Sequence, residues 1–96
     1  MTYLTNLSPE LSREVVIVNE LGLHARSAAK IAGLAQNSKA AVWVKKDAEK
    51  ADASSIVDIL TLACEKGSKI TLMIEDKADR PILEDIVNLI ETGFGE

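Results

Sequence analysis

Residues 21–29 read Leu-Gly-Leu-His-Ala-Arg-Ser-Ala-Ala and mark a change from one kind of structure to another. The run before them, residues 13–19, is short and rich in β-branched side chains, which is typical of a strand. From Ala25 to about Asn37, small and aliphatic residues recur at helical spacing. The sequence therefore predicts a strand, a turn at Gly22 and a helix that begins beside His24.

The rest of the chain repeats these two patterns. Alternating apolar residues predict strands over residues 40–46 and 68–75, with a very short edge strand near 50–52. Ser55 is predicted to cap a second helix, with Asp58 as the reciprocal cap, and this helix is expected to end near Gly67. A third helix is predicted to be capped by Asp79, with Pro81 in its first turn, and to stop at Gly93.

This β-α-β-β-α-β-α order predicts an α+β domain. The strands are mostly half-polar, so a four-stranded antiparallel sheet with three helices on one face is expected. Residues 1–12 are predicted to form an irregular N-terminal leader and residues 13–96 a single domain. In the second helix, Ile59, Leu62 and Ala63 are predicted to belong to the core.

Composition excludes several classes of function. The net charge of −4 and an aromatic content of 3% are unfavourable for nucleic-acid binding. No apolar run approaches the roughly 18 residues that span a bilayer, and the N-terminus lacks the basic region of a secretion signal, so a cytoplasmic protein without stable membrane association is expected. Cys64 is the only cysteine and is expected to be a buried thiol. No metal site and no organic cofactor are predicted.

His24 is the only histidine and the residue most suited to chemistry. The first turn of a helix carries unpaired N–H groups and a partial positive charge, and a neutral imidazole is a nucleophile near pH 7. A phosphoryl group on His24 would therefore meet the backbone N–H groups of Ala25, Arg26 and Ser27, together with the Arg26 side chain. The same local pattern also fits a histidine that only caps a helix.

A resemblance to a known family bears on that choice. Gly22-Leu23-His24-Ala25-Arg26 and the Ala-rich helix after it resemble the phosphorylated segment of the HPr family, the histidine-containing phosphocarriers of the bacterial phosphoenolpyruvate-dependent phosphotransferase system. Residues 54–62, Ser-Ser-Ile-Val-Asp-Ile-Leu-Thr-Leu, followed by Lys66-Gly67, resemble the family's second-helix region at a matching distance from His24. The resemblance covers residues 13–96, and the ending Gly93-Phe94-Gly95-Glu96 leans toward the nitrogen-related branch.

The resemblance implies a fold, a function and roles for particular residues. It implies the HPr-like open-faced β-sandwich, with His24 phosphorylated on Nδ1 and Arg26 beside the phosphate. Ser55 matches the serine that a dedicated HPr kinase/phosphorylase modifies in some bacteria. Three residues match the apolar patch that docks onto partner proteins: Ile56, Val57 and Leu60. Ser27 departs from the family, which typically has proline there, and its hydroxyl is expected to cap the helix or to contact the phosphate.

We therefore predict a monomeric phosphocarrier, not an independent enzyme. It would accept a phosphoryl group from phosphorylated enzyme I on His24 and pass it to enzyme IIA components, in sugar transport or in nitrogen-linked regulation. The alternative is a regulatory binding module of the same fold, acting through its docking helix and gated at Ser55. A third reading is a small ligand-binding domain in which His24 is a structural cap.

Overall fold

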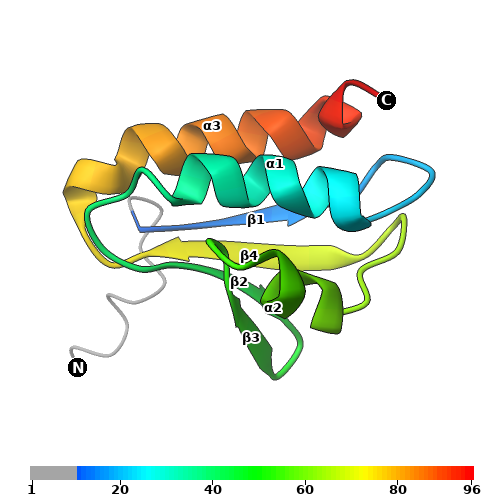
Figure 1. Ribbon diagram of the computed structural model, residues 1–96, viewed down its shortest axis with the longest axis horizontal. Coiled ribbons are helices and arrows are strands. Elements are labelled where there is room, and N and C mark those ends of the chain that lie inside the picture. The colour runs from blue at the N-terminus through cyan, green and yellow to red at the C-terminus, as the bar shows by residue number, and fades with distance from the viewer. Residues whose placement is uncertain (1–10) are drawn as a thin grey trace.

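The computed structural model describes residues 11–96 (Figure 1). Its main elements follow the predicted order: β1 (Ser12–Val16), α1 (Ala25–Ala35), β2 (Val42–Lys46), β3 (Glu49–Asp52), α2 (Ile56–Thr61), β4 (Lys69–Ile74) and α3 (Arg80–Glu91). Two short 3₁₀ turns, η2 (Lys77–Asp79) and η3 (Gly93–Gly95), flank α3. The predicted leader falls mostly on residues 1–10, which lie outside the described residues.

The four strands form one antiparallel sheet in the order β1-β4-β2-β3. Strand β4 is central and pairs with β1 and β2, so the last strand in the sequence lies between the first two. The helices pack on one face of this sheet and share a single hydrophobic core with it (Figure 1). The predicted two-layer α+β architecture is therefore confirmed.

Alternation along the strands decides which side chains enter the core. Val42 and Val44 are buried while Trp43, between them, lies on the opposite face. Val15 of β1 is buried in the same way, whereas the neighbouring Val16 is 42% exposed. The same core contains the apolar faces of the other strands and helices: Ile70, Leu72 and Ile74 of β4, Ala28, Ile31 and Ala35 of α1, and Leu83, Ile86, Val87 and Ile90 of α3. Leu34 of α1 and Ile82 of α3 are partly buried against it.

Helix α2 is shorter than predicted. It ends at Thr61 rather than near Gly67, because Ala63 adopts a left-handed conformation with φ of 52° and turns the chain away. The Lys46 ammonium of β2 donates hydrogen bonds to the carbonyl oxygens of Leu62 and Ala63, both at 3.1 Å. These bonds satisfy carbonyls that a longer helix would have paired internally.

The side-chain roles predicted for residues in and next to α2 are partly confirmed. Ile59 and Leu62 are buried as predicted, but Ala63 is exposed. Ser55 caps the helix by accepting a hydrogen bond from the Asp58 N–H at 3.1 Å. The reciprocal half of this cap is absent, because the Ser55 N–H donates to the Asp52 carbonyl.

The prediction that the Asp79 side chain caps α3 is wrong. This side chain is buried and accepts hydrogen bonds from the backbone N–H groups of Lys39 and Ala40, at 2.9 and 3.0 Å. It makes no capping bond to its own helix. Asp79 therefore ties the start of α3 to the connection between α1 and β2, which is a long-range contact rather than a local one.

Smaller differences concern element ends. Strand β1 begins at Ser12 and ends at Val16, whereas a strand over residues 13–19 was predicted. Helix α1 ends at Ala35, just short of the predicted Asn37. Within residues 11–96 there is no helix with the length and apolarity needed to cross a membrane.

Candidate phosphorylation site

The loop before α1 is fixed by contacts with the segment that follows α2. The Leu23 N–H donates a hydrogen bond to the Cys64 carbonyl at 2.8 Å, and Cys64 is buried as predicted. Gly22 has φ of 66°, and a Cβ atom there would lie 2.4 Å from the Cys64 carbonyl oxygen. Only glycine allows this close approach of the two backbone segments. Because the approach fixes Gly22 and Leu23, it also fixes the position of His24, which follows them.

His24 is the N-cap of α1, and its ring nitrogens have different partners. The Arg26 N–H, in the first helical turn, donates a hydrogen bond to Nδ1 at 3.2 Å. Nε2 lies 2.7 Å from Oε2 of Glu96. The side chain remains 26% exposed. Nδ1 therefore faces the positive end of the helix, where a bound anion would be stabilised.

Ser27 occupies the position where the resemblance implies proline, and it caps the helix. Its hydroxyl accepts a hydrogen bond from the His24 N–H at 2.9 Å. The same hydroxyl lies 3.1 Å from both the Gly22 and the His24 carbonyl oxygens, to which it can donate. Ser27 is fully buried, so of the two predicted roles for its hydroxyl the structure supports capping.

The segment after α3 folds back over the start of α1. Phe94 is buried and has φ of 60°, and Lys30 of α1 donates a hydrogen bond to the Phe94 carbonyl at 2.8 Å. These contacts place Glu96 beside His24. There Asn19 Nδ2 donates a hydrogen bond to Oε1 of Glu96 at 3.0 Å. The pairing of Glu96 with His24 was not predicted, because no local pattern links residues 72 apart in the chain.

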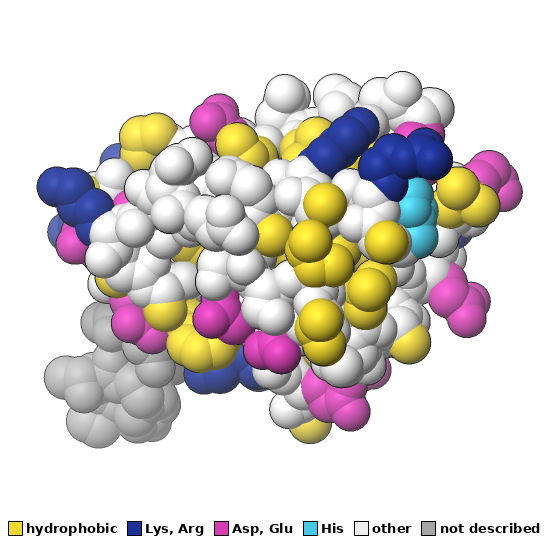
Figure 2. All heavy atoms as spheres, in the orientation of Figure 1, with side chains coloured by type: hydrophobic (Ala, Val, Ile, Leu, Met, Phe, Trp, Pro, Cys, Tyr) yellow, Lys and Arg dark blue, Asp and Glu magenta, His cyan; other side chains and the backbone are white. Residues whose placement is uncertain are grey.

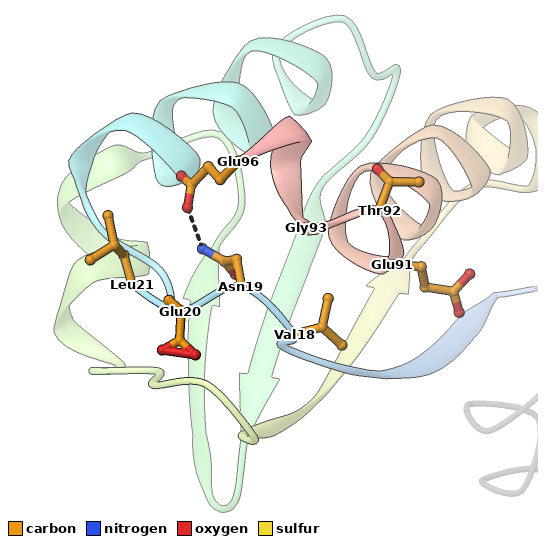
Figure 3. A pocket seen from close by; sticks show the side chains of 8 residues that line it. All are labelled: Val18, Asn19, Glu20, Leu21, Glu91, Thr92, Gly93 and Glu96. Atoms are coloured by element: carbon orange, nitrogen blue, oxygen red, sulfur yellow. Dashed lines mark hydrogen bonds between the residues drawn. The ribbon is translucent and has the colours of Figure 1, made fainter.

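The Glu96 carboxyl is held in its ionised form. The hydrogen bond from Asn19, followed by that from His24, lowers the pKa of Glu96 below its ordinary value, and the charge of Arg26 adds to this effect. Glu96 also lines a hollow of about 560 Å³, shown in Figure 3. The other residues around this hollow are Val18, Asn19, Glu20, Leu21, Glu91, Thr92 and Gly93.

The other predicted site residues lie on exposed surface. Arg26 is exposed. Ile56, Val57 and Leu60 are 38%, 71% and 37% exposed, which is unusual for three aliphatic side chains on one short helix. We call these three residues the α2 patch. Figure 2 shows hydrophobic side chains gathered beside the histidine on this face of the molecule, with basic side chains above the ring in this view.

Comparison with known proteins agrees with this geometry. A family model described as "PTS HPr component phosphorylation site" matches residues 11–92, which include His24 and all four strands. The chain belongs to the HPr family. It is therefore one of the phosphocarriers of the phosphotransferase system, as the resemblance implied, and such proteins carry a phosphoryl group rather than catalyse a reaction of their own.

HPr relatives of both branches are similar to the chain. The phosphocarrier protein HPr of Cupriavidus necator is 36% identical over 86 residues, which cover 90% of this chain and 97% of the relative. The phosphocarrier protein NPr of Shewanella violacea is 37% identical over 87 residues, covering 91% and 96%. The two branches thus match to nearly the same extent.

Solved HPr structures share the fold. HPr-C-His from Thermoanaerobacter tengcongensis superimposes with a TM-score of 0.83 at 35% identity, covering 88% of this chain and 96% of that one. HPr from Bacillus anthracis gives a TM-score of 0.77 at 30% identity, covering 83% of this chain and 95% of that one.

In residues 11–96 no three histidine, cysteine or acidic side chains come together in a way that could hold a metal ion.

Proposed function

We propose that His24 accepts a phosphoryl group on Nδ1 from phosphorylated enzyme I and passes it to enzyme IIA components in the cytoplasm. The observation that carries this proposal is the placement of Nδ1 at the N-terminus of an 11-residue helix, 3.2 Å from the Arg26 N–H, on a side chain that is 26% exposed. The protein would act as a monomer, with no metal or organic cofactor.

The helix N-terminus suits a carrier because it stabilises the phosphoryl group only moderately. After transfer, the first-turn N–H groups of Ala25, Arg26 and Ser27 can donate to phosphate oxygens, and the exposed Arg26 guanidinium can reach the same charge. These groups act on charge that arrives with the phosphoryl group. A partner protein must supply the remaining contacts, so the group can leave again when a second partner docks.

Docking would use the α2 patch, and Ser55 would regulate it. The patch lies on the face that carries His24, and its exposed aliphatic side chains fit transient contact with an apolar surface of each partner. Ser55 caps α2 next to the patch. A phosphate added to Ser55 by an HPr kinase/phosphorylase would place a double negative charge at this edge and weaken docking of apolar or acidic surfaces.

The test is phosphorylation by enzyme I and phosphoenolpyruvate. We expect wild-type protein to gain one phosphate that survives alkali and is lost in mild acid, as a phosphorus–nitrogen bond should, and His24→Ala to gain none. Subsequent addition of a sugar-type or a nitrogen-type enzyme IIA would show which one removes the label. No label on the wild type, under conditions that label a working HPr, would refute the carrier role. Retained partner binding would then favour a regulatory module.

A further inference from the structure

The geometry points to Glu96 as a positioning residue that fixes the His24 ring in the tautomer with its proton on Nε2, leaving Nδ1 free to accept phosphorus. This inference rests on the proposed carrier function and names a residue that acts through His24 rather than on the phosphoryl group. Its basis is the 2.7 Å contact between Nε2 and Oε2 of Glu96.

Two contacts on opposite sides of the ring require the same tautomer. An ionised carboxylate only accepts hydrogen bonds, so Nε2 must carry the proton that it shares with Glu96. A backbone N–H only donates, so Nδ1 must be unprotonated where it meets the Arg26 N–H at 3.2 Å. The opposite tautomer would place a proton between Nδ1 and the Arg26 N–H, and a lone pair against the carboxylate.

The Glu96 carboxylate is itself held at both oxygens. Oε1 accepts from Asn19 Nδ2 at 3.0 Å, while Oε2 accepts from His24. Asn19 is buried, and its Nδ2 also donates to the Gly22 carbonyl at 2.9 Å. The bond from Lys30 to the Phe94 carbonyl anchors the same segment. Glu96 is thus set in place by groups that are fixed before any partner arrives, which is what a positioning role requires.

This arrangement suits the transfer step. The Nδ1 lone pair attacks phosphorus, the bond between phosphorus and the donor atom breaks, and its electron pair returns to the donor. No proton has to leave Nδ1, because none is there. The ring becomes positively charged while Nε2 keeps its proton, and the Glu96 carboxylate at 2.7 Å balances that charge. In onward transfer the same proton keeps the ring a good leaving group.

The experiment measures the tautomer directly, by ¹⁵N chemical shifts of the imidazole at a pH where the ring is neutral. His24 is the only histidine, so its two ring nitrogens are observed without assignment of others. The test variants are Glu96→Ala and Glu96→Gln. Asn19 and His24 meet different oxygens of Glu96, so a glutamine in the same place would turn an NH2 group, which only donates, toward one of them. Glu91→Gln is the control, because it removes the same charge from the same hollow without touching the ring.

We expect wild type and Glu91→Gln to show one protonated and one unprotonated nitrogen. Both Glu96 variants should move part of the way toward averaged shifts, because the contact of the Arg26 N–H with Nδ1 remains. The rate of phosphorylation by enzyme I should fall on the order of tenfold in Glu96→Ala. Unchanged ring shifts in Glu96→Ala would overturn the inference even if His24 is phosphorylated. Shifts that change in a protein that cannot be phosphorylated would instead leave the inference standing and refute the carrier function.

Discussion

Gly22 and Gly33 show how the same residue type can have opposite roles. A Cβ atom at Gly22 would clash with the Cys64 carbonyl, and its φ of 66° disfavours other residues. Gly33 lies on an exposed position of α1 with nothing within 4 Å, so it does not mediate a close helix contact. The sequence predicted a turn at Gly22, but only the non-local contact with Cys64 shows that glycine is required there and dispensable at Gly33.

Substitution by alanine should therefore have effects of opposite sign. Gly22→Ala is expected to lower the free energy of unfolding by about 1–3 kcal/mol from backbone strain, with the steric clash adding to it. Gly33→Ala should raise it by about 0.5–1 kcal/mol, because alanine loses less backbone freedom in a helix. Urea denaturation of both variants is the measurement. Equal changes in the two proteins would contradict this account of the loop.

The lowered pKa of Glu96 predicts a particular pH dependence of stability. Because the folded state prefers the ionised carboxyl, Glu96 stabilises the fold fully above its ordinary value of 4.5 and loses that contribution as the pH falls through the lowered pKa. The difference in unfolding free energy between wild type and Glu96→Gln should thus shrink in acid. Denaturant titrations over this range would measure it, and a difference that stays constant with pH would count against the ionised contact.

The ends of the helices are set by distant partners. Lys46 of β2 holds the carbonyls that terminate α2, and Asp79 holds the backbone before β2 instead of capping α3. The sequence predicted the existence and order of these helices because their apolar periodicity is local. It could not predict their ends, because a cap and a long-range ligand use the same residue types.

Asp79 should matter for stability more than its place at a helix start suggests. Asp79→Ala leaves two backbone N–H groups without their acceptor, and hydrogen bonds to a charged group contribute about 1.5–3 kcal/mol each. We expect the free energy of unfolding to fall by at least about 2 kcal/mol. Asp85→Ala, an exposed aspartate on the same helix, should change it by less than about 0.5 kcal/mol. Similar losses of unfolding free energy in the two variants would show that the bonds from Asp79 to Lys39 and Ala40 contribute little to stability.

The site as a whole is assembled from three separate parts of the chain. The loop before α1 supplies His24, the segment after α2 supports Gly22, and the segment after α3 supplies Glu96. Sequence reasoning found His24 and Arg26 because they are neighbours in a recognisable motif. It missed Glu96 and Asn19, whose roles exist only once α3 has packed across the core and returned the chain to the start of α1.

On α2, the residues that stabilise the fold differ from the residues available to bind partners. Ile59 is fully buried in the core, while Val57, two residues earlier, is 71% exposed in the α2 patch. Ile59→Ala should lower the free energy of unfolding by about 2–5 kcal/mol through the lost contacts and the cavity left behind. Val57→Glu should change stability by less than about 0.5 kcal/mol, because the side chain already faces water.

For phosphoryl transfer from enzyme I, we expect Val57→Glu to have the larger effect and Ile59→Ala the smaller one. With both proteins assayed below their unfolding transitions, Val57→Glu should raise the carrier concentration that half-saturates enzyme I on the order of tenfold, because a charge replaces an apolar contact within the docking surface. Ile59→Ala should leave that concentration nearly unchanged. If Val57→Glu is phosphorylated as readily as wild type, partners do not dock on the α2 patch, and the apolar side chains exposed there need another explanation.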